Sequence, residues 1–119
     1  WLAGVNAPVT IGPGELHSGG KSVVVNVFVD LESTDQHTTR QAFFPLSQVT
    51  ETDGVYGAPP WLAKIKAVDA AYYWLTQGGR KGVDHFHGAG IGAHYVDGPS
   101  YSVSVSDLHD AADRAAEGR

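Results

Sequence analysis

At 119 residues the chain has room for one hydrophobic core, so we expect a single domain that spans residues 1–119. Hydrophobic residues make up 42% of the sequence, but no run approaches the roughly 18 consecutive apolar residues that a membrane span requires. The net charge of −5 and the scattered Lys and Arg residues exclude a basic surface for nucleic acid, and the absence of cysteine excludes disulfides and thiolate metal sites. These bounds predict a soluble, mildly acidic protein without a membrane or nucleic-acid partner, and they leave its cellular location open.

The first part of the chain predicts an irregular N-terminal arm followed by a hairpin. Residues 1–21 are dense in glycine and proline, which leaves room for at most a short strand near residues 2–9. Residues 22–31, SVVVNVFVDL, place four valines and a leucine at alternate positions, which is the period of a β-strand. Residues 39–46 return as a second strand after a polar loop, so we predict a β-hairpin.

Residues 61–77 predict the one long helix of the chain. Pro60 suits a first helical turn, and Gly78 follows the expected end. Larger apolar side chains recur at spacings of three and four residues and form one stripe, which we expect to face the core: Trp61, Ile65, Val68, Tyr72 and Leu75. Small residues form a flank beside this stripe: Ala63, Ala67, Ala70 and Ala71.

Three further strands are predicted beyond the helix, over residues 83–87, 94–96 and 101–105. Ser106 or Asp107 is expected to cap a short C-terminal helix. The strands come in hairpin-like runs, and only one long helix is available as a crossover. The predicted fold class is therefore α+β: a mostly antiparallel sheet of about four to six strands packed against one main helix, with a short C-terminal helix.

The segment Asp84-His85-Phe86-His87 carries the most specific candidate chemistry. In an extended strand, His85 and His87 lie on one face about 7 Å apart, a spacing at which two imidazoles share one metal ion. The glycines that follow would let His94 supply a third ligand, and the ion would be a divalent transition metal such as zinc. Two alternatives stay open: the histidines are ordinary polar residues on a solvent-exposed face, or one of them is a metal-free general base.

Aromatic side chains on the flanks of the helix suggest a second kind of site. Tyr73 and Trp74 lie outside the apolar stripe, and bulky aromatic residues in such positions are enriched at protein interfaces. The alternative for Trp74 is that it packs across the alanine flank into the core. The predicted strand at residues 101–105 is a further candidate, as an edge that pairs with another chain.

Two functional hypotheses follow from these candidate sites. The first is a non-catalytic binding or assembly subunit that acts through protein–protein contacts, in a homo-oligomer or a larger structure. The alternative is a small metal-dependent enzyme or metal-binding protein that uses His85, His87 and His94. The first is preferred because no complete catalytic motif occurs in the sequence, but whether the chain is an enzyme stays open.

Overall fold

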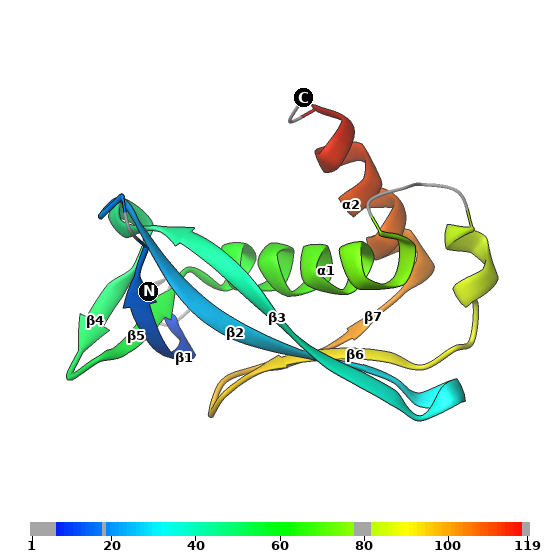
Figure 1. Ribbon diagram of the computed structural model, residues 1–119, viewed down its shortest axis with the longest axis horizontal. Coiled ribbons are helices and arrows are strands. Elements are labelled where there is room, and N and C mark those ends of the chain that lie inside the picture. Colours follow the sequence, from blue (N-terminus) through cyan, green and yellow to red (C-terminus); the bar gives the residue numbers. More distant parts are fainter. Residues whose placement is uncertain (1–6, 18, 78–81, 118–119) are drawn as a thin grey trace.

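A computed structural model describes residues 7–17, 19–77 and 82–117 (Figure 1). The strands in these ranges are β1 (Val9–Leu16), β2 (Ser22–Leu31), β3 (Gln36–Pro45), β4 (Thr50–Thr52), β5 (Val55–Ala58), β6 (Ile91–Tyr95) and β7 (Ser100–Val103). The α-helices are α1 (Pro60–Thr76) and α2 (Val105–Glu117), and short 3-10 helices occur at η1 (Glu32–Thr34), η2 (Leu46–Gln48) and η3 (Val83–Phe86). The predicted α+β class is confirmed, with one long helix, a C-terminal helix and a seven-stranded antiparallel sheet.

The central strand of the sheet is β2. The strands follow the order β4-β5-β1-β2-β6-β7, and β3 pairs with β2 in addition. β3 accompanies β2 along its whole length, whereas β1 pairs with the beginning of β2 and β6 with its end. β1 and β6 meet where Gly12 lies against Val96, at a spot where a Cβ on Gly12 would stand 3.1 Å from the Val96 carbonyl oxygen. The sheet thereby curls around α1 (Figure 1).

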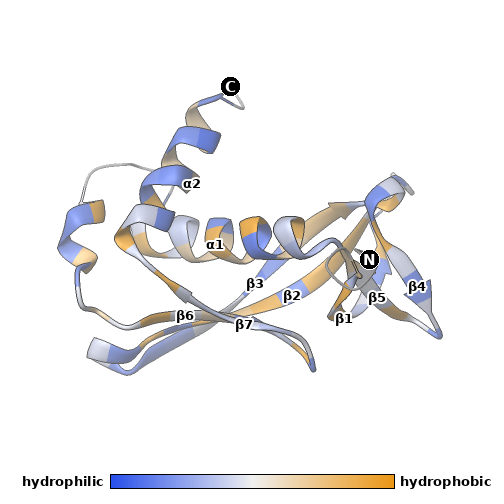
Figure 2. Cartoon of the chain, turned by 180° about the vertical axis from the view of Figure 1, so that it is seen from behind, coloured by the Kyte–Doolittle hydropathy of each residue, from blue (hydrophilic) through white to orange (hydrophobic). Residues whose placement is uncertain are grey.

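The core lies between the inner face of the curled sheet and α1. The alternation predicted for β2 is confirmed, because its odd-numbered residues are buried against the helix: Val23, Val25, Val27, Val29 and Leu31. Adjacent strands add Phe44 from β3 and Tyr95 from β6, whose rings lie 6.2 Å apart. Hydrophilic residues dominate α2 and the turn between β2 and β3 (Figure 2). The hydrophobic residues thus concentrate where the sheet meets α1.

The face that α1 presents to the core matches the predicted stripe only in part: Val68 and Tyr72 are buried as expected, but the buried face is centred on the alanines. The small-residue flank is buried, with Ala63, Ala67 and Ala71 completely inaccessible, whereas Trp61 at the start of the predicted stripe is 60% exposed. Alanine side chains let the helix axis approach the inner face of a curled sheet closely, which larger residues would prevent. The Tyr95 hydroxyl then donates a hydrogen bond of 2.6 Å to the Ala63 carbonyl oxygen. This bond fixes the helix over β6.

The C-terminal helix begins earlier than predicted. Ser104 caps it, because its Oγ accepts the Asp107 backbone N–H at 3.0 Å while the Asp107 carboxylate accepts the Ser104 N–H at 3.0 Å. This reciprocal cap shortens the preceding strand to Ser100–Val103. Arg114 of α2 then pairs with Asp69 of α1 at 2.5 Å. In the described ranges, no helix is both long and apolar enough to cross a membrane.

The prediction of an irregular arm over residues 1–21 is wrong for residues 9–16, which form β1 between β2 and β5. The glycine and proline content is accommodated by a register shift between Thr10 and Gly12, where Gly12 adopts a left-handed φ of 97°. Pairing on both sides supplies the stability that local propensity lacks. Residues 1–6 of the expected arm lie outside the described ranges.

Candidate protein-binding surface

The histidine segment does not form the predicted strand. Residues 83–86 are the 3-10 helix η3, which follows Gly82 at a left-handed φ of 90°. The His85 N–H donates to the Gly82 carbonyl at 3.0 Å, and the Ala89 N–H donates to the Phe86 carbonyl at 3.1 Å. These turns replace the ladder bonds of a strand, so the strand alternation that placed His85 and His87 on one face is absent. Both side chains are exposed.

His94 lies on a different part of the molecule. It belongs to β6, and its side chain projects from the outer face of the sheet, where its ring stacks on Phe28 at 5.3 Å. Its Nδ1 atom lies 4.0 Å from an Asp30 carboxylate oxygen. Within the described ranges, no three His, Asp or Glu side chains are grouped to hold a metal ion. The structure therefore does not assemble the predicted site from His85, His87 and His94.

Asp84 of the same segment has a partner that the sequence did not suggest. His109 of α2 lies 2.9 Å from its carboxylate, although 25 residues separate the two. The hydrogen bond to His109 lowers the pKa of Asp84, and the nearby His87 and His85 side chains contribute in the same direction. The pair joins η3 to α2 at the surface.

A different feature, the free edge of β3, stands out among the described residues. β3 has no strand partner there other than β2. The Leu46 N–H donates to the Lys21 carbonyl at 3.0 Å, and this pair continues the register of β2 and β3. Because antiparallel pairs alternate, even-numbered residues of β3 bond to β2, and odd-numbered residues direct N–H and C=O outward. The outward residues, which we call the β3 edge, are His37, Thr39, Gln41 and Phe43.

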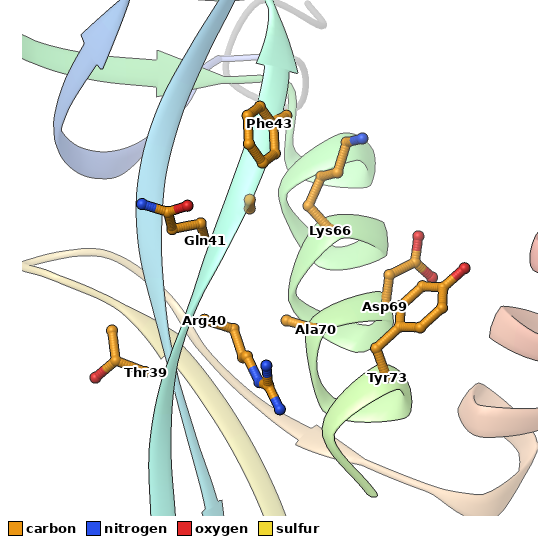
Figure 3. Close-up of a pocket in the computed structure, with 9 residues that line it drawn as sticks. Thr39, Arg40, Gln41, Phe43, Lys66, Asp69, Ala70 and Tyr73 are labelled. Atoms are coloured by element: carbon orange, nitrogen blue, oxygen red, sulfur yellow. The ribbon is translucent and has the colours of Figure 1, made fainter. Parts of the chain in front are cut away.

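A groove runs between β3 and α1 (Figure 3). Its volume is about 610 Å³, and we call it the β3–α1 groove; its lining residues are Thr39, Arg40, Gln41, Ala42, Phe43, Lys66, Asp69, Ala70 and Tyr73. Arg40 extends toward the helix, whereas Thr39 and Gln41 extend from the other side of the strand. Ala42 and Ala70 are nearly buried, so small side chains form the apolar part of the groove. Long or charged side chains surround that part.

Phe43 links the groove to the outer face of the sheet. Phe43 is 42% exposed, and its ring makes an edge contact with the His17 ring at 5.2 Å. Leu16 of β1 is 58% exposed. Phe43 also lines a second hollow, on the outer face, together with Leu16, His17 and residues of β2. Gln41 and Phe43 of the β3 edge thus line a hollow on each side of the sheet, and Thr39 lines only the β3–α1 groove.

The two predicted interface residues have different positions. Tyr73 lines the β3–α1 groove with 49% of its surface exposed, in edge contact with the Tyr72 ring at 5.2 Å. Trp74 is only partly exposed and packs against the core, which agrees with the alternative considered for it. The candidate edge strand near the C-terminus is β7, which pairs only with β6 in the described ranges but has four residues. It is less than half as long as β3.

Arg40, Lys66 and Phe43 were not selected from the sequence. A signal existed for Phe43, since two adjacent phenylalanines in a strand must face opposite sides, and Phe44 is the buried one. Pro45 was a partial signal for an edge strand, because proline is confined to edges or strand ends, but which edge of β3 is open depends on the pairing of the whole sheet. Comparisons with known protein families, with curated proteins and with solved structures give no match for this chain.

Proposed function

We propose that this chain is a non-catalytic protein-binding module that accepts an extended segment of a partner along the β3 edge. The observation that carries the proposal is the run of four outward residues, whose backbone groups have no strand partner among the described residues. Three of these residues line the β3–α1 groove, and Gln41 and Phe43 also line the outer hollow. A partner strand would bond to these groups and direct alternate side chains into the β3–α1 groove and the outer hollow. This is the geometry of strand addition, in which main-chain bonds give affinity and side-chain pockets give specificity.

Edge protection on β3 is limited to the inward-facing charge of Arg40 and to Pro45 at the end of the strand, which supports this proposal. Natural edge strands are commonly blocked by bulges, by proline, or by charged residues such as lysine. The pairing of β2 with β3 is continuous over ten residue pairs, and Pro45 lies only at the last of them. From His37 to Phe43 the edge extends about 20 Å at about 3.3 Å per residue, which is long enough for a six- or seven-residue segment.

A partner of different sequence is favoured over a second copy of the chain. The antiparallel register that engages all four outward residues of two copies pairs His37 with Phe43 and Thr39 with Gln41. That register places Arg40 directly opposite Arg40 of the second copy, and like charges in this position are destabilising. Sedimentation velocity tests the point: a monomer is expected at micromolar concentrations, and a dimer abolished by Thr39→Pro would indicate self-pairing instead.

The proposal is tested by selecting binders from a random twelve-residue peptide library displayed on phage, with Thr39→Pro as the matched negative. Proline at position 39 removes one outward N–H without removing a bond to β2, so the fold is expected to persist while strand addition is blocked. Selected peptides should bind the parent protein and Thr39→Ala equally. They should bind Thr39→Pro at least about tenfold more weakly, because a ladder bond is lost and the proline ring obstructs the edge.

Two results would contradict the proposal. One is the absence of any peptide enriched on the parent over Thr39→Pro. The other is a set of peptides whose binding shifts the amide resonances of a different surface and leaves those of β3 and α1 unchanged. Circular dichroism melting of each variant distinguishes loss of binding from loss of fold.

A further inference from the structure

The charges in the β3–α1 groove are unevenly balanced. Arg114 of α2 donates two hydrogen bonds to the Asp69 carboxylate, at 2.5 and 3.2 Å. It thereby neutralises the one acidic side chain among the described residues that line the groove. Arg40 and Lys66 form no ion pair with any residue in the described ranges. The groove therefore presents two uncompensated positive charges on a chain whose net charge is −5.

The geometry of strand addition determines which partner residue meets Arg40. Arg40 bonds to β2 through its backbone, so an antiparallel partner residue opposite it belongs to a pair without hydrogen bonds between the two. Side chains approach most closely in such pairs, with Cα atoms about 4.5 Å apart. The opposing side chain also points to the same face as Arg40, into the groove.

The next groove-facing position lies opposite Ala42. Ala42 and Ala70 have small side chains and are 6% and 9% exposed. They leave room for a bulky apolar side chain, which would cover both alanines and contact the aliphatic stem of Lys66. In an antiparallel partner, the residue opposite Ala42 precedes the residue opposite Arg40 by two positions.

We infer that the partner is an extended segment with the pattern bulky apolar residue, any residue, Asp or Glu, whose carboxylate is bound by Arg40. The inference rests on the proposed strand addition and adds the chemistry of the ligand. Lys66 supplies a second positive charge from the facing helix. Main-chain bonds hold the segment, and the groove selects its sequence.

The test repeats the phage selection in parallel on the parent, Arg40→Glu and Lys64→Glu. Lys64 belongs to the same helix but lies toward α2, 4.0 Å from Asp107 and outside the groove, so its substitution is a control of equal charge change. The parent and Lys64→Glu should select Asp or Glu two residues after a bulky apolar residue. Arg40→Glu should select Lys or Arg at the acidic position.

Measured affinities make the comparison quantitative. Replacing the acidic residue of a parent-selected peptide by Gln should weaken its binding to the parent about fivefold, and replacement by Lys should weaken it further. Arg40→Gln should bind the acidic peptide at most about twofold more tightly than the Gln peptide, because only Lys66 remains to favour the acidic residue. It provides a second variant should Arg40→Glu fold poorly. Melting curves check that each variant is folded.

The two proposals fail in different ways. Peptides that bind at β3, as shown by Thr39→Pro, but lack an enriched acidic residue or do not respond to Arg40→Glu would overturn this inference and leave strand addition intact. The absence of binders sensitive to Thr39→Pro would overturn strand addition and this inference together. Inversion of the preferred charge by Arg40→Glu, without a change for Lys64→Glu, is the result expected.

Discussion

β2 and β3 are the two arms of one hairpin, with ten residues each, yet they occupy opposite environments. β2 is paired on both edges and buried on its inner face, whereas β3 is paired on one edge and is largely exposed. One row of residues crosses the sheet and illustrates the contrast: Tyr95 on β6 and Val27 on β2 are buried, and Arg40 on β3 is exposed. We therefore expect β2 to contribute mainly to stability and the β3 edge to the proposed binding, so substitutions at the exposed residues of β3 should change binding without unfolding the protein.

The two strands should differ most in the stability cost of a proline substitution, tested at the directly opposed residues Phe28 of β2 and Thr39 of β3. Phe28 and Thr39 face each other in the register, but the Phe28 N–H is directed toward His94 and the Thr39 N–H toward the free edge. Phe28→Pro should cost at least about 2 kcal/mol more than Phe28→Ala, because a carbonyl inside the sheet loses its donor. The corresponding difference in the free energy of unfolding between Thr39→Pro and Thr39→Ala should be below about 1 kcal/mol. Urea unfolding gives the free energy of unfolding of all four variants. An equal cost of proline on β2 and on β3 would contradict the difference between the two strands.

The next largest difference in stability is expected at Val27 of β2 and Arg40 of β3, an opposed pair on the face of the sheet toward α1. Val27→Ala should lower the free energy of unfolding by about 2 kcal/mol, because Val27 is completely buried and a cavity would remain. Arg40→Ala, directly opposite, should change it by less than about 0.5 kcal/mol, since Arg40 is exposed and makes no ion pair with the described residues. Thermal melts of both variants are the measurement, and a larger loss for Arg40→Ala would show that β3 is structural.

A smaller effect on stability is expected at Tyr95 of β6, which lies opposite Val27 in the sheet. Tyr95→Phe should cost about 1 kcal/mol at neutral pH, since the buried hydrogen bond to the Ala63 carbonyl is lost. Burial raises the pKa of Tyr95 far above its usual value, so folding retains a proton that the unfolded chain releases above about pH 10. The stability of the parent should therefore fall above pH 10, at up to about 1.4 kcal/mol per pH unit for this group. Unfolding of Tyr95→Phe at pH 9 to 11 should show a shallower fall, and an identical slope would contradict the burial of this hydroxyl.

The smallest effect is expected at the surface pair of Asp84 and His109. The hydrogen bond from His109 lowers the pKa of Asp84, so His109→Gln should raise it toward about 3.9. Any stability from the pair is present above about pH 4 and is lost as the pH falls through the lowered pKa. Carbon-detected NMR titration of the Asp84 carboxyl checks the shift, and an unchanged midpoint in the variant would show that the pair does not form in solution.

The sequence was most informative where local pattern and tertiary environment agree. The valine alternation of β2 identified a half-buried strand, and residues 61–77 predicted α1 to within one residue at each end. Tertiary pairing decided the rest: β1 forms from a segment rich in glycine and proline because strands on both sides bind it. At residues 83–87, Gly82 and the contact with α2 favoured a turn over the predicted strand.

The candidate surface was harder to predict than the fold. The chemistry of histidine is recognisable from the residue type alone, so a metal site can be predicted from sequence. An unpaired strand edge depends on the pairing of the whole sheet and has no comparable residue signature. The sequence of β3, QHTTRQAFFP, contains two local hints: the adjacent pair Phe43 and Phe44, and Pro45, which suits an edge or a strand end. Its exposure follows from the pairing of β1 and β6 with the opposite edge of β2. The residues of β6 lie at least 60 positions from their β2 partners in the chain.

The central claim is that a partner strand pairs with the β3 edge, and residue-resolved amide hydrogen exchange tests it most directly. In the free protein the N–H groups of His37, Thr39, Gln41 and Phe43 should exchange quickly, while those of the even-numbered residues of β3 are protected by β2. Saturation with a selected peptide should slow the odd-numbered amides at least about tenfold and leave the even-numbered ones nearly unchanged. Protection without this alternation, or protection confined to another strand, would contradict the account.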